Sequence, residues 1–213
     1  MHSSMSTPVP LDLRYVSAAE ALHRRIPAWR DTDLAFESLR VALPGFDAPT
    51  TLLKAAAVNA LYYTNVFAIA RVAAHFTDVL ARSDLQREEA GLVERLAAVP
   101  QGGSEKRPVR RTSLAAKFAH FFIDGDRFPI YDQYAVRMVA HHLGIARSSL
   151  EISYVEFARR FEELALSVDM TTNRRRLDRY LWVQGQFEAW KKGIAETSSE
   201  LRPFFERGEW PQA

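Results

Sequence analysis

Apolar residues recur at intervals of three and four positions along most of this 213-residue chain, and no long stretch alternates with a period of two. The first spacing marks one face of an α-helix, whereas the second is typical of a half-buried strand. The pattern therefore predicts an all-α fold. The predicted helices cover residues 17–25, 32–43, 50–80, 85–99, 113–123, 132–144, 153–167 and 173–192.

Two segments bear on the organisation of the chain. Residues 50–80 are too apolar all round for a surface helix, so we expect a central, mostly buried element. Thr64 or Asn65 breaks it into two helices, because both residue types cap helices well. Residues 100–108 form the clearest loop, since they combine proline, glycine and charged residues. We expect a single helical domain over all 213 residues, either undivided or built from two lobes that meet around a cleft near residues 100–132.

Composition narrows the class of protein. Hydrophobic residues make up 47% of the chain and charged residues 25%, which is ordinary for a globular domain. No apolar run approaches the roughly 20 residues that a membrane-spanning helix needs, so we expect no membrane partner. Cysteine is absent, which excludes disulfides, thiolate zinc sites and cysteine nucleophiles. This absence fits a reducing compartment, and we expect a cytoplasmic protein.

The basic residues are clustered, although the net charge is only +2. Arg174, Arg175 and Arg176 are consecutive, and a second cluster lies beside the predicted loop. The second cluster consists of Lys106, Arg107, Arg110 and Arg111. Such clusters suit contacts with phosphates, but a solvated surface rich in arginine accounts for either cluster by itself.

Lys117 lies at the edge of an apolar stripe on the predicted helix 113–123. The stripe consists of Leu114, Phe118, Phe121 and Phe122. A lysine placed there is partly desolvated, which makes a neutral, nucleophilic amine accessible for Schiff-base chemistry on a sugar or carbonyl carbon. The alternative is that the stem lies on apolar surface while the ammonium reaches water. The spacing by itself favours this alternative.

Asp132 follows Pro129 and precedes a predicted helix, so it is a natural N-cap. A carboxylate at that place can cap the helix and also face a cleft, so a structural role does not exclude a chemical one.

Three segments together resemble the helix-hairpin-helix DNA glycosylases, in particular the 8-oxoguanine branch. Residues 132–144 resemble the helix that follows the catalytic aspartate of that superfamily, with an arginine at position 137 and Leu-Gly at the end. Residues 112–117 are similar to the hairpin that ends in its nucleophilic lysine. Residues 61–71 resemble the helix pair that carries an asparagine wedge into DNA. The three segments occur in the family's order, which is more specific than any one of them.

The resemblance implies a two-lobed helical enzyme that acts on double-stranded DNA without a cofactor or metal. Lys117 would attack the anomeric carbon of a flipped nucleotide, Asp132 would stabilise the cationic sugar, and β-elimination would nick the strand. Asn65, with Tyr62 or Tyr63, would fill the gap left by the flipped base. The cluster at 106–111 would hold DNA phosphates beside the segment 112–117. The backbone amides near Ser113 would also be available to a phosphate there.

The chain also departs from the superfamily's pattern. Ser113 and Ala115 replace the hairpin glycines, and the interval from Lys117 to Asp132 is shorter than usual. A shorter interval implies a shorter helix or connecting turn.

Other residues invite functional interpretations. His141 and His142 are adjacent on a helix and point in different directions, so we expect no metal site there. Trp182 and Gln186 lie on the last long helix and are candidates for a base pocket, because aromatics stack on bases and glutamine binds their edges. Aromatic residues at helical spacing also form an ordinary core.

Two alternatives to excision remain. The same scaffold could bind nucleic acid, a nucleotide or a partner protein without catalysis, for example as a bacterial defence accessory protein. A structural helical interaction protein would also have this composition. The sequence identifies neither the base that is recognised nor any protein partner.

Overall fold

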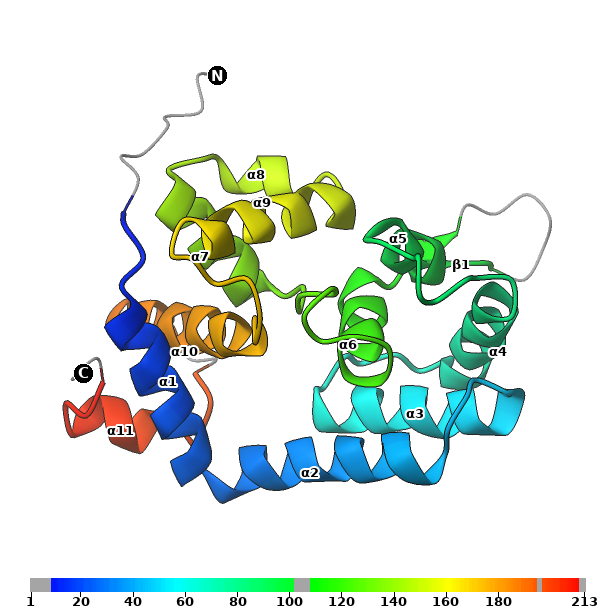
Figure 1. Ribbon diagram of the computed structural model, residues 1–213. Helices are drawn as coiled ribbons and strands as arrows, with labels where there is room; N and C mark the ends of the chain where they lie inside the picture. The colour runs from blue at the N-terminus through cyan, green and yellow to red at the C-terminus, as the bar shows by residue number, and fades with distance from the viewer. Residues whose placement is uncertain (1–8, 102–107, 195–196, 211–213) are drawn as a thin grey trace. The chain divides into compact units, whose positions relative to one another are not determined.

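The computed structural model describes residues 9–101, 108–194 and 197–210, and it is almost entirely helical (Figure 1). The prediction of an all-α fold is confirmed. The helices of these residues are α1 (Leu13–Arg25), α2 (Pro27–Ala42), α3 (Ala48–Leu61), α4 (Ile69–Leu80), α5 (Gly91–Ala97), α6 (Thr112–Phe122), α7 (Gln133–Leu143), α8 (Arg147–Leu150), α9 (Tyr154–Leu166), α10 (Arg175–Lys191) and α11 (Arg202–Glu206). Among the described residues, no helix is long and apolar enough to cross a membrane.

The chain divides into two compact units. The first combines residues 1–30, 132–152 and 156–213, and the second combines residues 31–131 with 153–155. The boundaries therefore lie in α2, just before Asp132, and around the start of α9. The segment after Val99 is inside the second unit.

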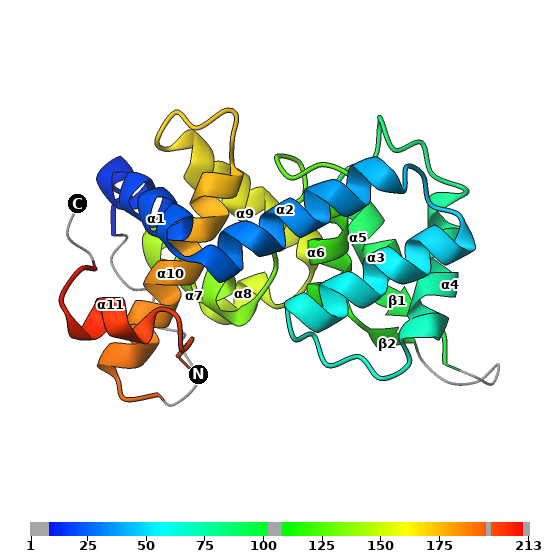
Figure 2. The same cartoon turned by 90° about the horizontal axis from the view of Figure 1, so that it is seen from below.

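The second unit is built around α6, which contacts α3 and α5 (Figure 2). Every residue of α6 from Leu114 to Phe122 is buried, so neighbours cover all sides of this helix. Phe36 stacks on Phe121 with ring centroids 4.4 Å apart, and Phe76 meets Phe118 edge-on at 5.0 Å. Aromatic pairs of this kind contribute about 0.5–1.5 kcal/mol each beyond their buried area.

The apolar segment 50–80 is broken into two helices as predicted, but neither Thr64 nor Asn65 caps one of them, because the N-cap of α4 is Ala68. Helix α3 ends at Leu61 and α4 begins at Ile69, and Asn65 lies in the connecting loop. Helix α5 is shorter than the predicted helix 85–99. Its C-terminal neighbours form the strand β1 (Ala98–Val99), which pairs with β2 (Val109–Arg110). Each strand has only two residues, which is too short to show an alternating pattern, so periodicity misses them.

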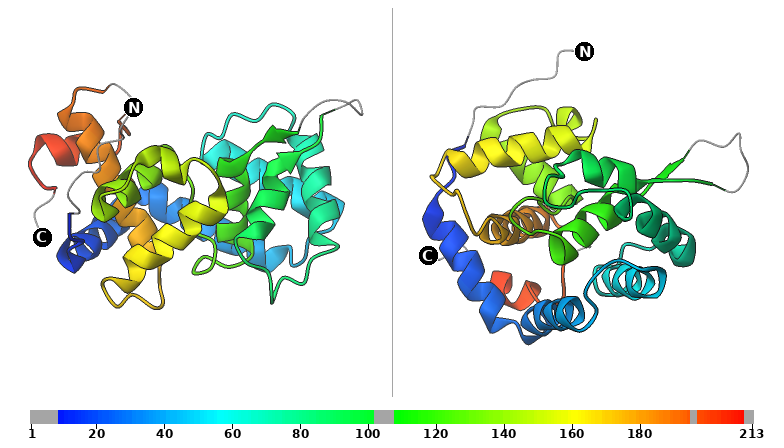
Figure 3. Two further views of the ribbon diagram at one scale, coloured as in Figure 1. Left: turned by 90° about the horizontal axis from the view of Figure 1, so that it is seen from above. Right: turned by 45° about the vertical axis from the view of Figure 1, so that its right-hand side comes forward.

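The first unit places α10 against both α1 and α7 (Figures 1 and 3). Gly185 permits the close approach of α7, because a Cβ atom at this position would lie 2.7 Å from Tyr134 Cβ. Helix α7 ends at Gly144, whose φ of +66° is readily adopted by glycine, as the sequence predicted. Pro27 is the first residue of α2, a position where the missing backbone N–H costs nothing.

Candidate functional site

Lys117 is buried in the second unit rather than placed at the edge of a surface stripe. Its exposed fraction is 5%, and its Nζ donates a hydrogen bond to Ser113 Oγ at 2.6 Å. The amine also lies 5.8 Å from the centre of the Tyr62 ring. The structure therefore brings Ser113, Tyr62 and Lys117 together, and it contradicts the interpretation in which the ammonium reaches bulk water.

Ser113 lies inside α6 and is not its N-cap. The helix begins one residue earlier, at Thr112, and Arg111 occupies the N-cap position without a side-chain hydrogen bond. The Ser113 hydroxyl is instead directed one turn forward to Lys117. Since a buried ammonium is stable only when polar atoms surround it, the hydroxyl serves the lysine rather than the helix end.

A second buried lysine was missed by the sequence analysis. Lys54 on α3 is 1% exposed, and its Nζ donates to the Gly45 carbonyl oxygen at 2.8 Å and lies 4.5 Å from the centre of the Phe46 ring. Burial lowers the pKa of Lys54. Lys54 lies in the segment 50–80 that was predicted to be mostly buried, but its partners, in the loop before α3 and on α6, are not apparent from the sequence. Lys54 shows that this unit also buries a lysine for a structural purpose.

Asp132 is the N-cap of α7, as predicted. Its Oδ1 accepts hydrogen bonds from the backbone N–H groups of Tyr134 and Ala135, both at 2.8 Å. The other carboxylate oxygen, Oδ2, makes no hydrogen bond within the described residues. Asp132 belongs to the first unit and Lys117 to the second, so each is described in its own surroundings.

The loop between α3 and α4 is held by a single side chain. Asn59 Oδ1 accepts from the Val66 amide at 2.9 Å and from Thr64 Oγ1 at 2.7 Å, while Asn59 Nδ2 donates to the Val66 carbonyl at 3.1 Å. These bonds fix both ends of the turn. The conformation of the loop is therefore stabilised by contacts within its own unit.

This loop presents two aromatic side chains to solvent. Phe67 is 99% exposed and Tyr63 is 82% exposed. Tyr63 and Asn65 have positive φ angles of 47° and 54°, a region that costs an ordinary residue roughly 1 kcal/mol or more. From Asp47 to Asp78 the intervening sequence contains no acidic residue. The sequence analysis missed Phe67, because an apolar run gives no sign of which member is left outside the core.

Tyr62, unlike the two exposed rings, packs on the aromatic core of the unit. Its ring lies 5.1 Å from that of Phe121 and 5.9 Å from that of Phe36. Tyr62 thus joins the loop to the core beside Lys117, whereas Tyr63 and Asn65 lie on the surface.

The basic cluster beside α6 is only partly described. Lys106 and Arg107 lie outside the described residues, while Arg110 forms an ion pair with Glu94. Of the consecutive arginines, Arg174 pairs with Glu162 and Arg176 donates to Ser17 Oγ at 3.2 Å. These contacts give several of the arginines structural partners.

The two residues considered for a base pocket make packing contacts in the first unit. Trp182 meets Trp29 edge-on, with ring centroids 4.9 Å apart. Gln186 is buried, and its Oε1 accepts from the Ser198 amide at 3.0 Å. A role in base recognition for either residue stays a prediction.

The adjacent histidines have different surroundings. His142 is buried and contacts Tyr180, whereas His141 is exposed. Within the part of the chain that the structure describes, no three acidic or histidine side chains are grouped so that they could hold a metal ion.

Comparisons with known proteins identify the family to which the chain belongs. Residues 14–126, more than half of the chain, match the model of the HI_0787_N family, which is described as an N-terminal domain. An uncharacterized protein of Haemophilus influenzae is 31% identical over 133 residues, which are 60% of this chain. The match spans 62% of that relative, less than two thirds of its length. No solved structure matches the chain.

Proposed function

The chain belongs to the HI_0787_N family, and we propose that it is a DNA base-excision enzyme in which Lys117 acts as the nucleophile of a glycosylase with strand-nicking activity. The observation that carries the proposal is the burial of the Lys117 amine between Ser113 and the Tyr62 ring. Burial disfavours the charged form of an amine, and the neutral form is the nucleophile.

The proposed reaction begins with attack of the Lys117 lone pair on C1′ of a flipped nucleotide. The bond from C1′ to the base breaks, and the base leaves with the electron pair and takes up a proton. Loss of a proton from the lysine nitrogen, with opening of the sugar ring, gives a Schiff base. Removal of a C2′ proton then expels the 3′ phosphate by β-elimination, which cuts the strand.

Asp132 would stabilise the cationic sugar in this reaction. Its Oδ1 is occupied by the α7 amides, which hold the carboxylate in place. Oδ2 keeps its lone pairs for the developing positive charge at C1′, and a preorganised carboxylate costs no reorganisation when that charge forms. The excised base would be an oxidised purine, as the resemblance to the 8-oxoguanine branch implies.

The loop 62–68 would contribute to the DNA interface. Its exposed aromatic rings suit stacking on bases, and its lack of acidic residues avoids repulsion of phosphates. Arg111 and the amides of the first turn of α6 would contact the backbone next to it.

A second candidate function is nucleic-acid binding without excision. The hydrogen bond from Lys117 to Ser113 favours it, because this contact and a 5% exposed fraction also describe a lysine that only stabilises the unit. Lys54 is an example of such a lysine in the same unit.

Borohydride trapping on duplex DNA distinguishes the two functions. We expect the protein to form a covalent adduct with DNA containing 8-oxoguanine or an abasic site, and Lys117→Met to abolish it. Lys54→Met, which removes the other buried amine of the unit, should keep the adduct. Circular dichroism checks that both variants are folded. DNA binding by the unmodified protein without any adduct would establish the second function instead, and an adduct that survives in Lys117→Met would refute the assigned nucleophile.

A further inference from the structure

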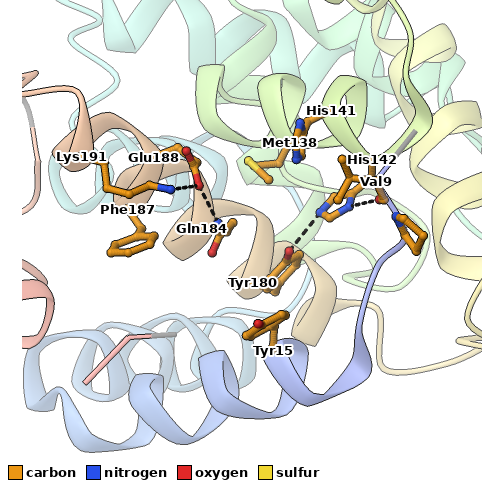
Figure 4. A pocket seen from close by; sticks show the side chains of 11 residues that line it. Val9, Tyr15, Met138, His141, His142, Tyr180, Gln184, Phe187, Glu188 and Lys191 are labelled. Carbon is orange, nitrogen blue, oxygen red and sulfur yellow. Dashed lines mark hydrogen bonds and ion pairs between the residues drawn. The ribbon is translucent and has the colours of Figure 1, made fainter. Parts of the chain in front are cut away.

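A pocket of about 200 Å³ opens within the first unit between α1, α7 and α10 (Figure 4). Tyr15, Met138, Tyr180 and Phe187 supply aromatic and apolar surface from these three helices. Pockets for drug-sized ligands usually exceed about 300 Å³. This pocket therefore suits a ligand of one or two rings.

One wall of the pocket is a closed relay of hydrogen bonds. His142 Nδ1 lies 2.7 Å from the Val9 carbonyl oxygen, and His142 Nε2 lies 3.0 Å from the Tyr180 hydroxyl. Because a carbonyl only accepts, Nδ1 carries the proton and Nε2 accepts from Tyr180. Burial lowers the pKa of His142 and raises that of Tyr180, so both groups stay neutral. The His142 Nδ1–H and the Tyr180 O–H both donate within the relay, so neither is left to donate to a ligand.

The opposite wall carries a polar pair, Glu188 and Lys191, at the solvent-exposed side of the pocket. Glu188 Oε1 accepts from Lys191 Nζ at 2.7 Å and from Gln184 Nε2 at 3.0 Å. Gln184 is oriented in turn by Trp210, whose Nε1 donates to Gln184 Oε1 at 3.0 Å. Glu188 Oε2 makes no hydrogen bond within the described ranges of the chain. The wall thus offers one acceptor, Glu188 Oε2, beside the remaining N–H donors of Lys191.

We propose that this pocket binds a nucleobase whose exocyclic amine adjoins a ring-nitrogen acceptor, of the adenine type, as the free base or the nucleoside. The amine would donate to Glu188 Oε2, and the ring nitrogen would accept from Lys191. The planar ring would lie against Tyr15, since aromatic side chains provide stacking surface for bases. The Phe187 ring stacks on Trp190 and lies 4.9 Å from Lys191 Nζ, so it closes the wall behind the lysine. Hypoxanthine carries a carbonyl in place of the amine, so its oxygen would face the Glu188 carboxylate with no proton between them.

The pocket lies away from Asp132, the candidate catalytic residue of the same unit. Met138 and His142 follow Asp132 by six and ten residues on α7. With a rise of about 1.5 Å per residue, the pocket lies roughly 9 Å or more along the helix from Asp132. Binding here therefore does not require the excision reaction.

Calorimetric titration of the full chain with adenine and hypoxanthine, in the absence of DNA, tests this assignment. Adenine should bind at least tenfold more tightly than hypoxanthine. Glu188→Met, which removes the acceptor, should weaken adenine binding at least tenfold, and Lys191→Met should weaken it severalfold. Lys192→Met is the matched control, because the neighbouring lysine does not line the pocket, and it should bind as the unmodified protein does.

Three results would overturn the assignment: no adenine binding, equal affinity for the two bases, or unchanged adenine affinity in Glu188→Met. The comparison of the two bases uses the unmodified protein, so it stands even if a variant fails to fold. Trapping through Lys117 is measured separately on DNA, and its failure would leave adenine binding unaffected.

Discussion

Asp132 has a structural role and a proposed chemical role that different substitutions can separate. The structural role follows from the local sequence, because an aspartate after an extended proline segment readily caps the next helix. The proposed chemical role depends on charge, which capping does not require. Lys117 differs, since its burial follows from the helices packed around α6 rather than from its own neighbours.

Asp132→Asn should keep the stability of the protein and lose excision. Asparagine caps helices about as well as aspartate but carries no charge to stabilise a cationic sugar. Asp132→Ala should lose excision and also about 1 kcal/mol of unfolding free energy, because the cap is removed. Urea denaturation and a strand-nicking assay measure the two effects. Excision at the normal rate by the asparagine variant would reduce Asp132 to a capping residue.

The loop 62–68 shows how one element can be shaped by a residue outside it. Asn59, on the last turn of α3, supplies side-chain hydrogen bonds to the backbone N–H and C=O groups of Val66. These bonds help to hold a turn in which Tyr63 and Asn65 have positive φ angles. The exposed rings of Tyr63 and Phe67 are not buried in the core of the unit, so packing within the unit does not account for them. The proposed contact with DNA would give them a partner.

Phe67→Ala should leave stability within about 0.5 kcal/mol, because the side chain is exposed. Its affinity for duplex DNA with an abasic site should fall fivefold or more, since stacking of a base on an aromatic ring contributes about 1–3 kcal/mol. Fluorescence anisotropy measures this change. Ile152→Ala removes an exposed apolar side chain of the first unit and serves as the control. Equal affinities of the two variants would exclude the loop from the interface.

The segment matched by the family model and the second unit end at similar positions but begin at different ones. The family model ends at residue 126, close to the end of the second unit at residue 131. At its start, however, the model includes α1, which packs on α10 and contributes Glu20 to an ion pair with Arg179 in the first unit. The segment matched by the family therefore contains one helix whose partners follow it in the chain.

Phe118→Ala tests whether each unit is stabilised by its own core. Truncation of this fully buried ring should cost about 3–5 kcal/mol in the second unit. Hydrogen exchange should accelerate in α3, α4, α5 and α6, while α1, α7 and α10 keep their protection. Equal acceleration in all seven helices would show a single cooperative unit instead.

The sequence by itself determined the helical class, the break near Asn65, the cap at Asp132 and the end of α7 at Gly144. These features depend on side chains within a few residues of one another, so local chemistry is sufficient to predict them. Only the tertiary structure decided that Lys117 and Lys54 are buried, that Phe67 is exposed, and that α1 joins the unit formed by the C-terminal half. Each of these depends on which faces of a helix are covered by distant segments, and periodicity along one helix carries no information about its neighbours.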